Sequence, residues 1–215
     1  MYDTIGYLDT MLSTASCRIM YGEYCVPQLS HQANGKFAVT EMYHPLIPEG
    51  VRNSITAERS VLLTGSNASG KSTFIKTVAL NAILAQTLHT VLAENYQASW
   101  FCIASSMALR DDILSQESYY IVEIRSLKRI LDLTRLSELP VLCFIDEVLR
   151  GTNTVERIAA SSEILKYLKD KNVLCFAATH DIELTYLLED IYQNCHFEEV
   201  LQDGDVSFDY LLKEG

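Results

Sequence analysis

Short runs of consecutive hydrophobic residues recur along the chain and predict buried strands. The clearest runs cover Val61–Leu63, Val141–Ile145 and Val173–Ala178, and Trp100–Ala104 is a shorter one. Strands that are apolar on both faces are typical of a parallel sheet covered on both sides. Residues Lys36–Tyr43 instead alternate between hydrophobic and polar side chains, which also predicts a strand.

Hydrophobic residues at helical spacing predict four helices. They cover Thr4–Tyr21, Lys71–Leu88, Tyr119–Leu136 and Val155–Lys169. The second helix is apolar on nearly every side, which indicates burial. Strands and helices alternate from residue 60 onward, so the sequence predicts an α/β fold with a mostly parallel sheet flanked by helices. Hydrophobic segments on either side of Asp203-Gly204 predict a hairpin near the end of the chain.

Charge, cysteine content and hydropathy indicate which partners and which cellular compartment to expect. The 215 residues carry a formal net charge of −11, whereas a surface that grips duplex DNA is normally basic, so this chain is not expected to hold DNA by itself. Six cysteines include no Cys-x-x-Cys pair, which favours reduced thiols and a cytoplasmic location. No signal peptide is visible, and the most apolar helical stretch, Val78–Leu88, is too short to cross a bilayer. No membrane contact is therefore expected from this chain.

One Gly-rich segment follows the strand Val61–Leu63 and fits the pattern G-x-x-x-x-G-K-[ST] at every fixed position. Such a loop turns backbone N–H groups toward phosphate oxygens at the N-terminus of a helix. Lys71 is then expected to reach the β- and γ-phosphates of ATP, and the Ser72 hydroxyl to bind Mg²⁺. A Gly- and Ser-rich turn can be purely structural, but the order strand, loop, helix favours nucleotide binding. The expected nucleotide-binding residues are Gly65, Ser66, Asn67, Ala68, Ser69, Gly70, Lys71, Ser72 and Thr73.

Two carboxylates follow the apolar run Val141–Ile145. Asp146 is expected to lie beside the Gly-rich loop, on a neighbouring strand, and to hold Mg²⁺ directly or through water. Glu147 is then placed to orient or deprotonate the attacking water. A strand can end in polar residues for no chemical reason, but the presence of the Lys71 loop argues against that interpretation. Two adjacent acids favour hydrolysis over transfer of the phosphoryl group to another substrate, because they supply a base for the attacking water.

Two further residues are weaker candidates. His180 follows the strand Val173–Ala178, and the carboxyl ends of parallel strands share one edge of a sheet, so its ring could bond the γ-phosphate or the attacking water. A structural role fits its spacing equally well. Ser118 precedes the helix Tyr119–Leu136, where a Ser is a good N-cap but could also meet a phosphate at the helix N-terminus. Spacing alone does not choose between these roles.

Taken together, these segments resemble the ATPase domain of the MutS family of DNA mismatch repair proteins, over nearly the whole chain. The family's T-G-P-N-x-x-G-K-S-T, D-E-I-G-R-G-T-S-T and A-T-H motifs are similar to Thr64–Thr73, Asp146–Thr154 and Ala178–His180. The second of these is the most specific, because D-E-x-x-R-G-T is rare among P-loop ATPases. A looser match to D-D-L-x-x-G-x-S-T-F-x-x-E covers Asp111–Glu123. The chain departs from the family pattern, which indicates a divergent branch, at Ser66, Leu149 and Val155–Arg157.

The resemblance implies a P-loop fold of the ABC-ATPase type, in which two such domains pair with ATP at their interface. Ser118 would face the γ-phosphate bound by the partner subunit, and His180 would sense that phosphate within its own subunit. Residues 1–35 would be the helical stub of an upstream lever, and residues 36–215 the ATPase domain. A homodimer is implied for the full-length protein, with DNA bound by regions outside this chain and moved by ATP binding and hydrolysis.

Three other functions remain open. Another ABC-type ATPase, such as a transporter or chromosome-maintenance subunit, is disfavoured by the short separation of Lys71 and Asp146 and by the lack of a clear L-S-G-G-Q motif. A scaffold that binds ATP with negligible turnover is disfavoured by the presence of Glu147. A small-molecule kinase would need an acceptor pocket and a lid, and the sequence carries no sign of either.

Overall fold

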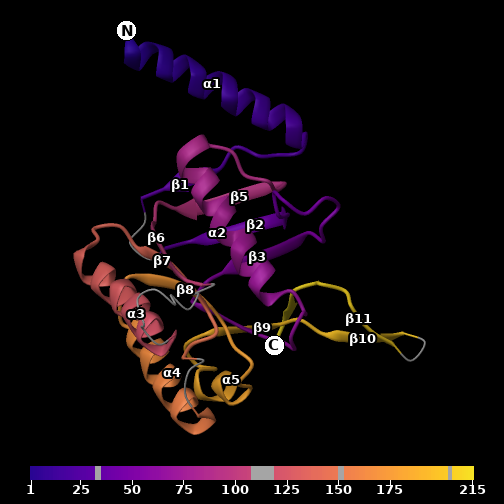
Figure 1. Cartoon of the computed structure of the whole chain (residues 1–215), viewed down its shortest axis with the longest axis vertical. Helices are drawn as coiled ribbons and strands as arrows, with labels where there is room; N and C mark the ends of the chain where they lie inside the picture. The colour runs from indigo at the N-terminus through magenta and orange to yellow at the C-terminus, as the bar shows by residue number, and fades with distance from the viewer. Residues whose placement is uncertain (32–34, 108–118, 150–152, 203–204) are drawn as a thin grey trace.

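The computed structural model describes residues 1–31, 35–107, 119–149, 153–202 and 205–215. Within these ranges the chain is a mixed α/β structure with two packed sheets, helices on both faces of the larger sheet, and a hairpin that projects from the body (Figure 1). The predicted α/β class is confirmed. Across the same ranges, no helix combines the length and the apolar character that a membrane crossing requires.

The larger sheet has six strands in the order β12-β9-β4-β8-β7-β6. The five strands from β9 to β6 run parallel, and β12 is antiparallel to β9. Because parallel strands point their carboxyl ends to one edge, the residues that follow them converge there. The strands are β4 (Val61–Thr64), β6 (Cys102–Ser106), β7 (Val141–Asp146), β8 (Val173–Ala178), β9 (Gln193–His196) and β12 (Lys213–Glu214).

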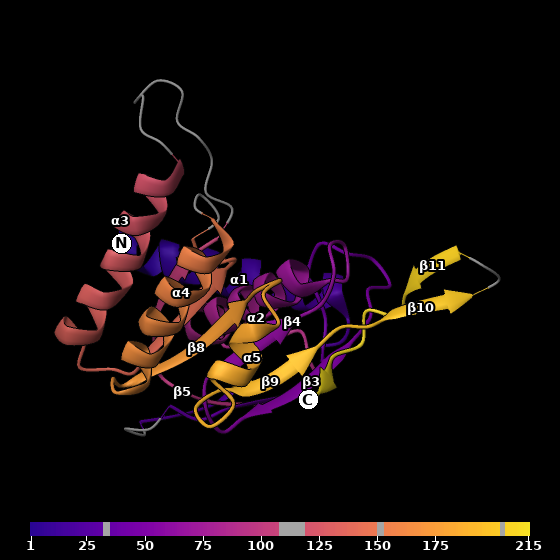
Figure 2. The ribbon, with the colours of Figure 1, turned by 90° about the horizontal axis from the view of Figure 1, so that it is seen from below.

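The smaller sheet has the order β1-β5-β2-β3. Strand β2 is antiparallel to both β5 and β3, and β1 is parallel to β5. Strands β10 and β11 form the predicted hairpin, which Figure 2 shows extending away from both sheets. The strands are β1 (Gln28–Ser30), β2 (Phe37–Met42), β3 (Asn53–Ala57), β5 (Asn95–Ser99), β10 (Glu199–Gln202) and β11 (Asp205–Phe208).

Alternate side chains of the central strands enter two separate cores. Val61 and Leu63 of β4 pack with α2 and the smaller sheet, whereas Leu62 between them packs on the other face with α3 and α4. All three side chains are fully buried. The continuous apolar runs in the sequence therefore reflect a sheet covered on both faces. The helices of the body are α2 (Lys71–Leu88), α3 (Tyr119–Leu136), α4 (Thr154–Lys169) and α5 (Glu183–Leu187).

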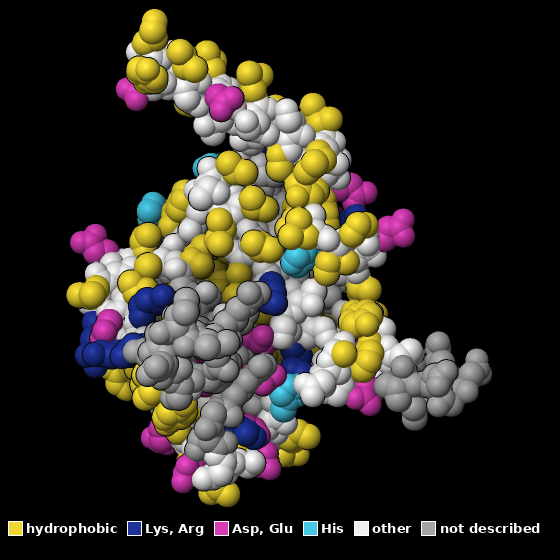
Figure 3. Space-filling model, viewed as in Figure 1, with side chains coloured by type: hydrophobic (Ala, Val, Ile, Leu, Met, Phe, Trp, Pro, Cys, Tyr) yellow, Lys and Arg dark blue, Asp and Glu magenta, His cyan; other side chains and the backbone are white. Residues whose placement is uncertain are grey.

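Helix α1 (Tyr2–Tyr21) stands apart from both sheets (Figure 1). Thr14 is buried, but many hydrophobic side chains of this helix are exposed, as Figure 3 shows. Contact with the body is made near the C-terminal end of α1, where Arg18 Nε donates to Thr90 Oγ1 at 2.9 Å and Arg18 Nη2 donates to the His89 carbonyl at 2.9 Å. Arg18 thereby ties α1 to the C-terminal end of α2.

Most predicted elements match the structure, and the differences fall on short elements or polar strands. The bounds of α2, α3 and β8 coincide with the prediction. The strand predicted over Trp100–Ala104 begins at Cys102 instead, because the Trp100 N–H bonds to the Ser30 carbonyl in the smaller sheet and its ring stacks on His31. Strands β1, β3, β5, β9 and β12 were not predicted, since they contain no continuous apolar run, and the five-residue helix α5 was not predicted either. Strand β1, within residues 1–35, joins the smaller sheet through β5.

Candidate functional site

The loop between β4 and α2 curls back on itself, and two glycines make this possible. Gly65 has a φ of 141° and Gly70 a φ of 108°, both in the region that favours glycine. A Cβ atom at Gly65 would lie 2.8 Å from Ser69 Oγ and 2.9 Å from the Phe197 carbonyl oxygen. A side chain at this position would therefore strain the backbone and collide with two separate segments.

We expect Gly65→Ala to destabilise the fold by about 1–3 kcal/mol, because it combines a disfavoured backbone angle with contacts too short for a real Cβ. Urea unfolding measures the change. Gly6→Ala on α1 is the control, since a Cβ there meets nothing within 4 Å. An unfolding midpoint for Gly65→Ala equal to that of the unmodified chain would show that the loop tolerates a side chain here.

Lys71 is the first residue of α2, and its ammonium group points back into the loop. Nζ donates to the Gly65 carbonyl at 2.6 Å and to the Ser66 carbonyl at 2.7 Å, and the residue is 5% exposed. Burying an ammonium group costs free energy unless the group is hydrogen-bonded, and the two carbonyl oxygens accept hydrogen bonds from it. A positive charge is thus held inside the loop at the N-terminus of an 18-residue helix, where an anion is favoured.

The two carboxylates at the end of β7 have different surroundings. Asp146 is the last residue of the strand, and its Oδ1 is buried and accepts no hydrogen bond from the residues that the structure describes. Glu147 leaves the strand with a φ of 59°, a left-handed angle that redirects the chain. Its N–H donates to the Ala178 carbonyl of β8 at 3.0 Å. The turn at Glu147 is therefore fastened to the neighbouring strand.

His180 connects this carboxylate to the loop. Its Nε2 lies 2.8 Å from Glu147 Oε1, and its Nδ1 lies 3.1 Å from the Gly65 carbonyl oxygen and 3.4 Å from Lys71 Nζ. An ionised carboxylate can only accept a hydrogen bond, so the contact with Glu147 places a hydrogen on Nε2. Three of the residues selected from the sequence, Lys71, Glu147 and His180, therefore meet at one place.

The prediction that Asp146 lies beside the loop on a neighbouring strand is wrong, because β8 lies between β4 and β7. Leu63 of β4 pairs with Ala178 of β8, and Ala178 pairs with Asp146 of β7. Strands β7 and β8 both have six residues and consist almost entirely of apolar residues, so the local pattern does not say which is adjacent to β4. Strand β8 brings His180 next to the loop instead.

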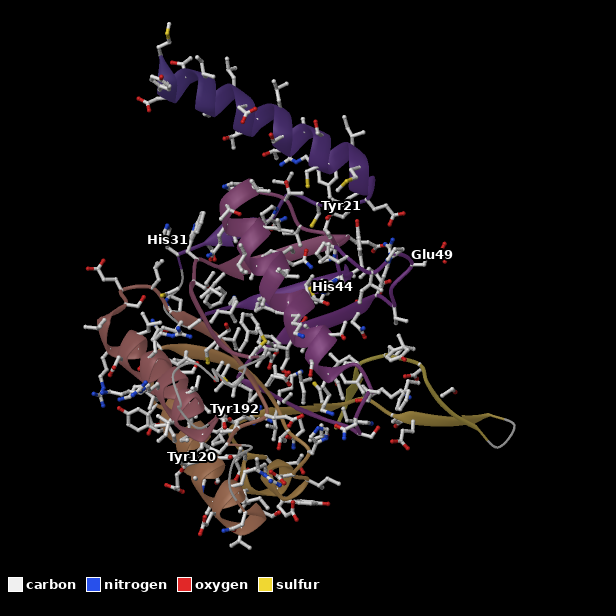
Figure 4. The ribbon with its side chains drawn as sticks, in the orientation of Figure 1. Tyr21, His31, His44, Glu49, Tyr120 and Tyr192 are labelled. Carbon is white, nitrogen blue, oxygen red and sulfur yellow. The ribbon has the colours of Figure 1, made fainter. Side chains whose placement is uncertain are left out.

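A cavity of about 610 Å³ opens beside this cluster. It is lined by loop residues 66–73, by Glu147 and His180, and by two other segments. Figure 4 shows one of its residues, Glu49, at the outer edge of the connection between β2 and β3. The volume is in the range of ligand pockets. The other segments contribute, among other residues, His44, Ile47, Val51, Asn53 and Tyr210.

His44 contributes a neutral imidazole to the cavity wall. Burial lowers the pKa of His44, and the positive charge of Lys76 lowers it further. The Leu46 N–H donates to His44 Nδ1 at 3.1 Å, so Nδ1 is an acceptor and the hydrogen of the neutral ring lies on Nε2. His44 is therefore able to donate one hydrogen bond to a bound molecule.

The sequence model of the family described as MutS domain V matches residues 61–215, from β4 to the last residue. The chain belongs to the MutS domain V family. It is 34% identical to the DNA mismatch repair protein MutS of Pseudothermotoga lettingae, over 85% of this chain and 23% of that protein. It is 29% identical to the DNA mismatch repair protein MutS 2 of Haloarcula marismortui, over 99% of this chain and 25% of that protein. The chain thus spans about a quarter of the length of these relatives.

Some residues selected from the sequence of this MutS domain V chain lie outside the described ranges. Ser118 is one of them, and so is most of the loosely matching stretch 111–123. Residues 150–152, which belong to the most specific motif, are also outside. The flanking residues Leu149 and Asn153 are described, and Asn153 caps α4 by accepting a hydrogen bond from the Glu156 N–H at 3.0 Å.

Tyr210 of this MutS domain V chain lines the cavity beside Asn53, although the sequence did not point to Tyr210. The Tyr210 carbonyl accepts from Asn53 Nδ2 at 3.0 Å, and the Leu212 N–H donates to Asn53 Oδ1 at 2.7 Å. These bonds fasten the C-terminal segment beside the cavity. A Cβ at Gly70 would lie 3.1 Å from Tyr210 Cδ1, so the tyrosine ring sits against the loop. A tyrosine after a predicted hairpin carries no local signal of such a long-range contact.

Proposed function

We propose that this chain binds ATP with Mg²⁺ and hydrolyses it, as a P-loop ATPase domain of the ABC type in a MutS-family protein. The observation that carries the proposal is that Lys71, Glu147 and His180 meet at a cavity walled by the G-x-x-x-x-G-K-[ST] loop. A phosphate-binding loop, a carboxylate and an imidazole at one cavity are suited to hydrolysis of a phosphoanhydride bond.

The loop is the proposed binding site for the phosphates of ATP. Lys71 Nζ is bonded to the Gly65 and Ser66 carbonyls, and phosphate oxygens are better partners for an ammonium group than carbonyl oxygens are. If phosphate oxygens replaced the two carbonyl oxygens, the Lys71 ammonium group would bind the β- and γ-phosphates. Backbone N–H groups of residues 66–73 and the positive end of α2 add to the attraction.

Ser72 and Asp146 fit a magnesium ion that binds together with the nucleotide. Asp146 Oδ1 is buried and makes no hydrogen bond within the described ranges, although buried carboxylate oxygens normally have a partner. Ser72 lies in the first turn of α2, next to Lys71. Carboxylate and hydroxyl oxygens are ligands that Mg²⁺ accepts beside water and phosphate. Bound there, the ion would neutralise negative charge on the phosphates.

Glu147 is the proposed general base, and His180 the proposed contact to the γ-phosphate. The bond to His180 Nε2 orients the Glu147 carboxylate toward the loop that binds the phosphates. A water molecule between this carboxylate and the γ-phosphate would lose its proton to Glu147. The His180 ring lies 3.4 Å from Lys71 Nζ, so it is within reach of the phosphate that Lys71 binds.

Tyr210 is proposed to stack on the adenine ring. We expect Tyr210→Ala to weaken ATP binding about tenfold, because base–aromatic stacking contributes about 1–3 kcal/mol. Binding of inorganic tripolyphosphate should stay unchanged, since this ligand has no base. Calorimetric titration measures both affinities, and Tyr186→Ala, an exposed tyrosine of α5 outside the cavity, is the control. An equal loss of affinity for ATP and for tripolyphosphate would instead indicate that the substitution damages the phosphate-binding loop.

The role of the whole protein is proposed from its relatives. The relatives named above are DNA mismatch repair proteins, which supports a role in DNA mismatch repair. The proposal includes a homodimer in which two such domains pair and Ser118 faces the γ-phosphate bound by the partner subunit. DNA would be held by other parts of the full-length protein, and the net charge of −11 supports a DNA contact outside this chain.

Equilibrium binding of ATP, with and without Mg²⁺, is the first test of the nucleotide site. A fluorescent ATP analogue should bind saturably, more tightly with Mg²⁺, and should be displaced by unlabelled ATP. Adenosine should displace it poorly, because the loop and Lys71 recognise phosphate groups. Absence of saturable binding under these conditions would contradict the proposed function.

A further inference from the structure

Arg157 and Asp181 form a largely buried ion pair beside His180. Arg157 Nε donates to Asp181 Oδ2 at 2.8 Å, and Arg157 Nη2 donates to Asp181 Oδ1 at 2.6 Å. The two side chains are 25% and 10% exposed. Two parallel bonds between a guanidinium and a carboxylate fix both distance and orientation. Neither residue lines the cavity, so neither is expected to touch a molecule bound there.

The turn that carries His180 is held on both sides. Before it, the Thr179 N–H donates to the Leu63 carbonyl at 2.9 Å, which fastens the turn to β4 just ahead of the phosphate-binding loop. After it, the Asp181 N–H donates to Thr179 Oγ1 at 3.0 Å, and the Asp181 carboxylate is held by Arg157. His180 therefore lies between one attachment to β4 and a second attachment to α4.

Helix α4 is bonded to the segment of Glu147 as well. Arg157 lies in the first turn of the helix, where its N–H donates to the Asn153 carbonyl at 2.9 Å. One turn farther along, Ser161 Oγ donates to the carbonyl of Val148 at 3.3 Å, next to Glu147. The helix thus connects the two chain segments whose side chains meet at the site.

The charge of Arg157 maintains the ion pair. The bond to Asp181 raises the pKa of Arg157, and the nearby Glu147 and Glu183 carboxylates raise it as well. Arg157 therefore stays charged and keeps its two bonds to Asp181, while Glu147 is the partner of His180 at Nε2.

We propose that Arg157 and Asp181 are positioning residues for ATP hydrolysis, whose bidentate ion pair holds His180 in contact with Glu147. This inference rests on the proposed ATPase function. It gives a role to Arg157, which stands in the sequence as a departure from the family pattern. Breaking the pair releases one side of the His180 turn and leaves the phosphate-binding loop intact, so turnover falls while ATP affinity is retained.

The kinetic test compares Arg157→Met and Arg157→Lys with the unmodified chain. Arg157→Met should lower kcat about tenfold and change KM and ATP affinity less than about twofold, because catalytic geometry is lost and ground-state binding is kept. The kcat of Arg157→Lys should lie between that of Arg157→Met and that of the unmodified chain, because lysine keeps the positive charge but cannot form the two parallel hydrogen bonds. The control is Lys166→Met, which breaks the exposed Lys166–Glu163 pair on the same helix and should leave kcat unchanged.

A merely structural ion pair would behave differently. Arg157→Met would then lower the urea midpoint while the folded protein kept the kcat of the unmodified chain, and this result would overturn the inference. Failure of the unmodified chain to bind or hydrolyse ATP would contradict the proposed function itself, whatever Arg157 does.

Proton NMR of the His180 ring gives a readout that needs no turnover. The Nε2–H held by Glu147 should appear as a slowly exchanging downfield signal that is absent in His180→Asn. We expect Arg157→Met to remove the protection of this signal and Lys166→Met to preserve it. Its retention in Arg157→Met, or its absence from the unmodified chain, would overturn the positioning role.

Discussion

Lys71→Ala is expected to lower the affinity for ATP by about a hundredfold or more, because truncating a buried, hydrogen-bonded charge costs about 2–5 kcal/mol. Lys71 is 5% exposed and holds its ammonium group inside the loop, between the Gly65 and Ser66 carbonyls. Alanine removes the charge that would meet the β- and γ-phosphates. Calorimetric titration with ATP and Mg²⁺ measures the loss.

Lys128→Ala is the control for this change. Lys128 lies on α3, is exposed, and does not line the cavity. It carries the same charge, so an effect of net charge alone would appear in both variants. If Lys71→Ala has the urea midpoint of the unmodified chain and binds ATP within a few-fold of its affinity, Lys71 does not contribute to the nucleotide site.

Glu147→Gln is expected to keep ATP binding and to lower turnover by about a hundredfold or more, since a positioned general base contributes about 10²–10⁴ in rate. Glutamine has nearly the same shape and can still bond to His180, but its amide does not accept a proton from water. Phosphate release from a single turnover separates this loss from any change in binding.

Glu94→Gln serves as the control for the loss of a carboxylate. Glu94 is exposed and does not line the cavity, so its substitution should leave both binding and turnover unchanged. Full turnover in Glu147→Gln would end the assignment of Glu147 as the base and would direct attention to Asp146.

The elements around the site were predictable because each depends on a local pattern. The run Val61–Leu63 is buried on both faces, and the loop that follows needs glycine at positions 65 and 70 for backbone angles that other residues rarely adopt. Lys71 begins a helix that is buried on most of its length, as its apolar composition indicates. Local sequence therefore specifies the strand, the loop and the helix together.

Long-range relationships were not predictable in the same way. The position of β8 between β4 and β7 depends on pairing among apolar strands of similar composition. The strand next to β4 and its loop is therefore the one that precedes His180, and not the one that ends at Asp146. Tyr210 reaches the cavity through bonds to Asn53, 157 positions away along the chain. The Arg157–Asp181 pair also joins residues that no local pattern relates. Each of these relationships joins segments that are separate in the sequence.

Phosphate release per chain, measured against protein concentration with and without Mg²⁺, tests whether this domain is a Mg²⁺-dependent ATPase. We expect a Mg²⁺-dependent rate that rises with concentration, because paired domains would complete the site, and that is lost in both Lys71→Ala and Glu147→Gln. Release that persists without Mg²⁺ and in both variants would rule out the proposed site. Bound ATP with no release at any concentration would contradict hydrolysis and leave a nucleotide-gated scaffold.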